Sequence, residues 1–113
     1  MYLTVLLFFV TFLASTIPKP NKFLLKPSDV TVLKNQEAIL ECIVFGYPKP
    51  IVEWHKDGVN IALSSTGNYS KFGANSLNIS SAQTTDAGKY ECVMGNEKAE
   101  ATLHVIGELR FIF

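Results

Sequence analysis

Apolar and polar residues alternate in short runs from residue 24 onward. In the run EAILECIVF, residues 37–45, one face is formed by Ala38, Leu40, Cys42 and Val44. Four later runs repeat the pattern, at residues 51–58, 76–80, 89–94 and 99–105. Alternation with one apolar face is typical of half-buried strands in an antiparallel sheet. Helical periodicity is absent from these runs, so the sequence predicts an all-β domain.

Turn residues separate the runs. Gly, Pro, Asn and Ser lie between them, and Asp57-Gly58 at the end of the second run is a hairpin signal. Short strands with such separators predict a β-sandwich or a barrel. The inward positions of the alternating runs predict a core that contains Leu40, Trp54, Leu77, Ile79, Tyr90 and Leu103.

The first fifteen residues, MYLTVLLFFVTFLAS, have a different character. The segment 3–14 is apolar apart from two threonines, and it is shorter than the roughly 20 residues that span a bilayer. Its length fits a secretory signal peptide cleaved between Ala14 and Thr16, whereas a buried helix or an uncleaved anchor is the alternative. The chain is therefore divided into a signal peptide (1–15), an N-terminal linker (16–23), a folded domain (24–106) and a C-terminal tail (107–113).

The chain has two cysteines, Cys42 and Cys92. Two cysteines in an oxidising compartment most often pair, and closing a loop of about 50 residues contributes roughly 4 kcal/mol. Each cysteine lies on the apolar face of its strand, so the bridge would join the inner faces of two packed sheets. Trp54 faces inward on the next strand, where it can pack against the sulfurs. Tyr90, two positions before Cys92, can bond backbone at a strand corner through its hydroxyl.

The order Cys, Trp, Tyr-x-Cys is the immunoglobulin signature. The chain resembles an immunoglobulin domain of the intermediate set, which is common in cell-adhesion molecules, axon-guidance receptors and matrix proteins. The segments LECIVFGYPKPIVEWHKDG, SLNISSAQTTDAGKYEC and AEATLHV carry the resemblance. It implies an immunoglobulin-like antiparallel Greek-key β-sandwich with one inter-sheet disulfide. It also implies that Asp86 pairs with a basic residue across the bottom of the domain, for which Lys71 is the candidate.

Charge and side-chain placement argue against an enzyme, and we expect no cofactor, metal site or small-molecule substrate. Ten basic and ten acidic residues are interspersed and give a net charge of zero, so no nucleic-acid surface is indicated. Both histidines, His55 and His104, face outward, away from the cysteines. Three carboxylates, Glu53, Glu91 and Glu100, also face outward, and we expect them to be solvated instead of forming a catalytic pair.

Two Asn-x-Ser sequons, at Asn68 and Asn78, are candidate N-glycosylation sites in a secreted chain. Asn78 points outward beside the first alternating run, whose outward side chains include Ile39, Ile43 and Phe45. Three apolar side chains on one exposed sheet face need a cover or a partner. Either a glycan on Asn78 shields them, or they form a homophilic or heterophilic contact and the sequon is unoccupied. Scattered surface apolar residues are the third interpretation.

These observations favour a secreted or extracellular recognition module for cell adhesion or receptor–ligand binding. It would bind a protein partner through sheet faces and edges, and that partner would associate it with cell surfaces. The turn GNEK after Met94 is short and offers little surface for recognition through a loop. Two alternatives stay open: a structural spacer or segment of a larger multi-domain receptor or matrix protein, and a soluble immune-type decoy.

Overall fold

The structure is a computed structural model that describes residues 17–64 and 66–108. The predicted signal peptide, residues 1–15, lies outside the described residues, as does the end of the predicted tail, residues 109–113. Within the described residues, no helix has the length and apolar character needed to cross a membrane.

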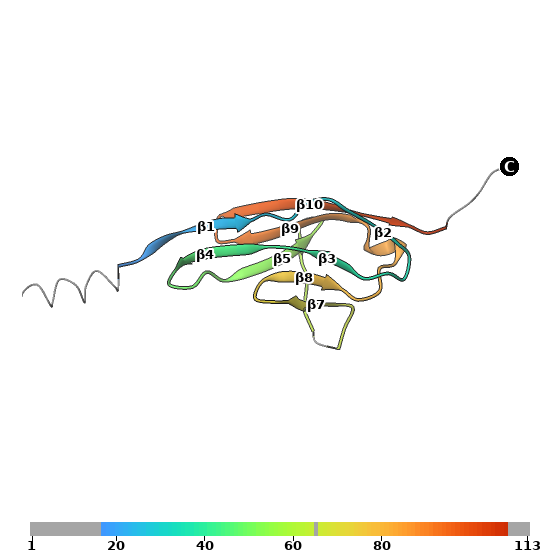
Figure 1. The fold of residues 1–113 in the computed structure, drawn as a ribbon, viewed down its shortest axis with the longest axis horizontal. Helices are drawn as coiled ribbons and strands as arrows, with labels where there is room; N and C mark the ends of the chain where they lie inside the picture. Colours follow the sequence, from blue (N-terminus) through green and yellow to red (C-terminus); the bar gives the residue numbers. More distant parts are fainter. Residues whose placement is uncertain (1–16, 65, 109–113) are drawn as a thin grey trace, which may run out of the picture.

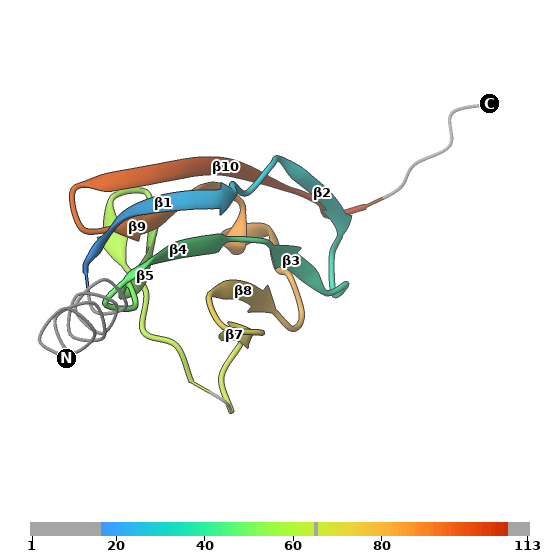
Figure 2. The same ribbon diagram turned by 60° about the vertical axis from the view of Figure 1, so that its left-hand side comes forward.

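Two β layers pack face to face (Figures 1 and 2). One is a five-stranded sheet in the order β2–β10–β9–β5–β6. Its strands are β2 Val30–Leu33, β5 Val52–Lys56, β6 Val59–Asn60, β9 Gly88–Met94 and β10 Glu97–Ile106. The other layer contains β1 Lys19–Leu25, β3 Ala38–Leu40, β4 Ile43–Tyr47, β7 Tyr69–Phe72 and β8 Ser76–Ile79. In it β1 pairs with β4, and β3, β8 and β7 form a three-stranded sheet.

The expected all-β sandwich with a Cys42–Cys92 disulfide is confirmed. Two features differ from the expectation. First, β2 pairs with β10 in parallel, so the sandwich is not wholly antiparallel. Second, the single strand expected over 37–45 is divided into β3 and β4, which follow one another along one line (Figure 1). The break occurs where the backbone N–H of Cys42 donates to the hydroxyl of Ser76 at 3.0 Å instead of to a strand carbonyl.

The first strand begins inside the segment 16–23 that the sequence assigned to a linker. β1 starts at Lys19, and its pairing with β4 runs from Lys19 opposite Tyr47 to Leu25 opposite Ile43. Only Phe23 in this strand packs against the core, while its other side chains are exposed. An edge strand with one core contact shows no alternation, which is why its sequence gave no strand signal.

The six side chains predicted for the core lie between the layers, each at most 2% exposed. The hairpin turns around this core are tight. At the expected turn between β5 and β6, Asp57 and Gly58 both have positive φ, +49° and +85°, as a two-residue type I′ turn demands. Gly95-Asn96 alone joins β9 to β10, with Gly95 at φ +62°. The β9–β10 end therefore presents little loop surface.

Candidate functional site

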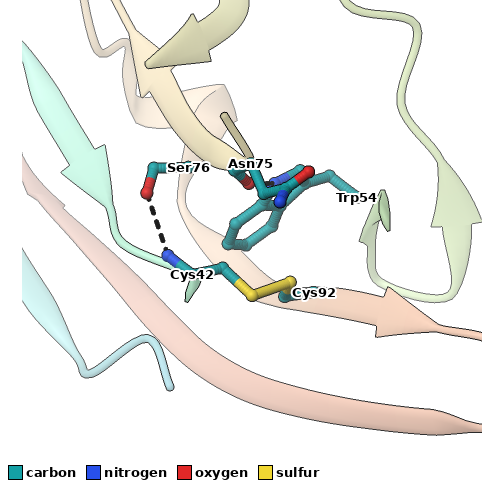
Figure 3. The surroundings of a disulfide bond; sticks show 5 residues. All are labelled: Cys42, Trp54, Asn75, Ser76 and Cys92. Atoms are coloured by element: carbon teal, nitrogen blue, oxygen red, sulfur yellow. Dashed lines mark hydrogen bonds between the residues drawn. A yellow bond between two sulfur atoms is a disulfide. The ribbon is translucent and has the colours of Figure 1, made fainter. Parts of the chain in front are cut away.

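The centre of the sandwich is built around the Cys42–Cys92 bridge, which links β9 to the junction of β3 and β4. Trp54 stands opposite Cys92 in the β5–β9 ladder, and its indole ring lies beside the bridge (Figure 3). The indole N–H donates to the backbone carbonyl of Asn75 at 2.8 Å, so the polar atom of this buried ring is satisfied. No free cysteine occurs among the described residues, and this centre is structural.

A buried carboxylate, that of Asp86, holds the corner between the short 3-10 helix η1 Thr84–Asp86 and β9. It accepts hydrogen bonds from the hydroxyl of Tyr69 at 2.5 Å, the amide of Asn68 at 3.1 Å and the backbone N–H of Gln83 at 2.8 Å. The expected ion pair with Lys71 is wrong, since none joins the two residues in the described part of the chain. Three donors satisfy the buried carboxylate, and no cation is needed.

Tyr90 closes the same corner. Its hydroxyl donates to the backbone carbonyl of Asp86, the kind of contact that the sequence predicted for it, and lies 3.3 Å from the hydroxyl of Tyr69. Burial raises the pKa of Tyr90, and the nearby Tyr69 and the Asp86 carboxylate raise it further. Burial and the hydrogen bond to Asp86 likewise raise the pKa of Tyr69.

We expect these tyrosines to make the domain less stable as the pH rises above about 10. Tyrosines of the unfolded chain ionise near that pH, whereas Tyr69 and Tyr90 lose their protons only at higher pH in the folded state because their pKa values are raised. The unfolded state then binds fewer protons, so for each such tyrosine the unfolding free energy falls by up to about 1.4 kcal/mol per pH unit. Urea unfolding at pH values on both sides of 10 checks this.

Two variants serve as controls for the alkaline effect. Tyr90→Phe should make the fall of the unfolding free energy with pH shallower, because it removes one of the two tyrosines whose pKa is raised. Val59→Ala should leave the slope unchanged, since Val59 carries no titratable group and is 69% exposed. Equal slopes for wild type and Tyr90→Phe would contradict the assignment of the effect to the buried corner.

Outward side chains of the five-stranded sheet contact one another in ion pairs and hydrogen bonds. Glu91 was expected to be solvated, but it is 7% exposed and pairs with Lys98 at 3.3 Å. It lies on the central strand β9 between its cross-strand neighbours Glu100 and His55, which cover it. His55 in turn lies 3.3 Å from the carboxylate of Glu53. The described residues contain no cluster of three or more potential metal ligands.

The opposite layer has an open, mainly apolar groove of about 520 Å³. Ile43 and Phe45 of β4 line one side, and Phe72 at the end of β7 lines the other. Their exposed fractions are 48%, 42% and 51%. Ile39, the third residue of the predicted contact face, does not line the groove; it is half-buried on β3 opposite Asn78. Phe72 was not predicted, because a four-residue strand is too short for alternation to reveal its outward face.

Lysines border this groove, which we call the β4–β7 groove. The ammonium groups of Lys19 and Lys22 each lie 6.0 Å from the centre of the Phe45 ring, and Lys49 lines the groove directly. None of the three forms an ion pair within the described residues. Glu41 is the one carboxylate in the described lining. The β4–β7 groove thus combines apolar walls with a net positive border.

Curated proteins similar to this chain are much longer than it is. The muscle M-line assembly protein unc-89 of Caenorhabditis elegans is 40% identical over 87 residues, which are 74% of this chain and 1% of that protein. The zwei Ig domain protein zig-1 of the same organism is 38% identical over 77 residues, 68% of this chain and 28% of that protein. The human netrin receptor DCC is 39% identical over 88 residues, 74% of this chain and 6% of the receptor.

Solved structures agree with the fold and with the family. A chain of the complex between titin M10 and an obscurin-like 1 Ig domain has a TM-score of 0.71 and 35% identity, covering 81% of this chain and 99% of that one. The titin domains Z1Z2 in complex with telethonin give a TM-score of 0.72 at 30% identity, covering 82% of this chain and 50% of that one. The family described as the immunoglobulin I-set domain matches residues 21–106. This chain therefore belongs to the immunoglobulin I-set family.

Proposed function

We propose that the chain is an extracellular recognition module that binds a protein partner in the β4–β7 groove. The observation that carries the proposal is the groove itself, in which three large apolar side chains stay between 42% and 51% exposed. Apolar surface left in water without a partner is costly, and clustered exposure marks interaction sites. Relatives named as a netrin receptor, and titin domains solved in complexes, support protein binding by domains of this family.

The border of the groove defines the chemistry of the partner. Lys19 and Lys22 lie over the Phe45 ring and Lys49 lines the groove. None of the three has a carboxylate partner in the described residues. A partner segment that places an apolar side chain between acidic residues would fill the groove and pair with the lysines at once. Complementary charge at the rim speeds association and fixes orientation, and the buried apolar contact supplies affinity.

An extracellular location is part of the proposal. The apolar segment 1–15 has the length and composition of a secretory signal peptide. The Cys42–Cys92 disulfide supports the same route, because disulfides persist in oxidising compartments and are rare in the cytosol.

We expect Ile43→Ser and Phe72→Ser each to weaken binding to cells about tenfold or more, because each removes an apolar side chain from the contact. A titration of the tagged full chain on intact cells measures the effect. Ile51→Ser and Val59→Ser are matched controls, since Ile51 and Val59 are 83% and 69% exposed and lie outside the groove. Equal losses in all four variants, or no loss in the groove variants, would remove the groove from the interaction.

A structural spacer is the second candidate function. It is favoured by the small share of its relatives that the chain covers, 1% of the M-line protein and 6% of the netrin receptor. In those proteins the matching domain is one segment of a long chain. A spacer with no ligand of its own predicts no saturable binding to cells, whereas the recognition module predicts saturation and sensitivity to Ile43→Ser.

A further inference from the structure

The two sequons lie in different environments, although their sequences are alike. Asn68 precedes β7, and both ends of its side-chain amide are used. Its nitrogen donates to the Asp86 carboxylate at 3.1 Å, and its oxygen accepts from the hydroxyl of Ser80 at 3.0 Å and from the backbone N–H of Ser81 at 2.9 Å. These bonds connect the start of β7 to the end of β8 and to the buried corner at Asp86. A sugar on the Asn68 nitrogen would have to fit within this corner.

Asn78 has no such role. It lies in the middle strand of its sheet, between Ile39 of β3 and Ser70 of β7, on the face turned away from Leu77 and Ile79 in the core. Its side-chain oxygen is buried without a hydrogen-bond partner in the described residues. A buried polar atom left unpaired is costly, and an unpaired one in a native structure needs an explanation. The side-chain oxygen of Asn78 therefore contributes no hydrogen bond that stabilises the described part of the fold.

We propose that Asn78 carries an N-linked glycan and that Asn68 is a structural asparagine that stays unmodified. The inference rests on the proposed extracellular location, since the modification belongs to the secretory route. The donor is a lipid-linked oligosaccharide pyrophosphate. The Asn78 nitrogen bonds to the first sugar carbon, the bond from that carbon to the lipid pyrophosphate breaks, and the nitrogen gives up one proton.

The position of Asn78 decides what its glycan covers. Ile39 stands directly opposite Asn78 in the β3–β8 ladder, so their side chains are about 5 Å apart at Cβ. Ser76, which lines the β4–β7 groove, is two residues before Asn78, about 7 Å along the strand. The first sugar therefore lies over Ile39 and beside the groove. Glycan and partner can occupy neighbouring parts of one sheet, in contrast to the two exclusive interpretations that the sequence allowed.

The test uses the full chain, secreted from animal cells and collected from the medium. Peptide mapping after enzymatic glycan release in ¹⁸O-water marks each formerly glycosylated asparagine as a heavy aspartate. We expect the mark at position 78 and none at position 68. Asn78→Gln should lose the whole glycan mass, whereas Ser70→Ala, which destroys the sequon of Asn68 without touching its amide, should carry the same glycan mass as the wild type. A mark at Asn68 in folded protein, or none at Asn78, overturns the inference.

A second arm keeps this inference separate from the proposed location. There the full chain is placed behind an established secretory leader. If only this arm delivers protein to the medium, the proposal of natural secretion fails, and the glycan map of the delivered protein still decides between Asn78 and Asn68. If both arms deliver protein with the mark at Asn78 alone, the two proposals stand together.

Discussion

The double variant Cys42→Ala/Cys92→Ala is expected to unfold with a free energy about 2–5 kcal/mol lower than that of the wild type. The bridge ties β9 to the junction of β3 and β4 across the two layers and closes a separation of 50 residues. Without it the unfolded chain regains the freedom that the crosslink removed. A domain of this size has a total stability of about 5–15 kcal/mol, so the loss is a large share of the whole.

Chemical denaturation followed by far-ultraviolet circular dichroism measures this loss. Wild-type protein reduced with dithiothreitol in the same denaturant series is the matched control, because it breaks the bridge and keeps the sequence. The reduced protein and the double variant should unfold at similar denaturant concentrations. A difference below about 1 kcal/mol between oxidised and reduced wild type would show that the bridge contributes little to stability.

Replacing Trp54 with alanine is expected to cost about 3–5 kcal/mol of unfolding free energy. The indole is 2% exposed, lies beside the bridge and donates to Asn75 (Figure 3). Trp54→Ala leaves a cavity between the layers and an acceptor without its donor. Trp54→Phe keeps most of the packing and removes the hydrogen bond, so it should cost less. Denaturation followed by circular dichroism compares the two, since fluorescence of the single tryptophan is lost in both.

Ile51→Ala is the control for the tryptophan variants. Ile51 precedes β5, like Trp54 it is large and apolar, and it is 83% exposed. Its truncation should change stability by no more than about 0.5 kcal/mol. A similar cost for Ile51→Ala and Trp54→Ala would contradict the account of the core. In a double-mutant cycle, Trp54→Ala and loss of the bridge should be non-additive, because the two groups are in contact.

The central strands could be predicted because burial of one face makes apolar and polar residues alternate along the sequence. Leu77 and Ile79 of β8 show this, as do Tyr90 and Cys92 of β9. The edge strands β1 and β2 could not be predicted, since their place depends on pairing with β4 and β10, far away along the chain. Pairing with a distant strand uses backbone groups that every residue except proline has in full, so it leaves no pattern in the side chains.

The candidate sites were harder to predict than the core, because their properties arise from contacts between distant segments. Asp86 accepts hydrogen bonds from Tyr69 and Asn68 because β7 packs against the corner. The sequence around Asp86 does not distinguish these partners from Lys71. The β4–β7 groove needs Phe72 beside β4, which only the folded sheet provides. The sequons at Asn68 and Asn78 match the same motif, and only their hydrogen bonds separate them.

Three outer strands, β1, β2 and β6, offer little to a further strand. In the five-stranded sheet the outer strands are β2, with four residues, and β6, with two. In the other layer β1 carries Pro20, which has no N–H to donate, together with Lys19 and Lys22. Short, charged or proline-bearing edges hinder edge-to-edge aggregation. Neighbouring copies of the domain are thus hindered from joining into a common sheet through β1, β2 or β6.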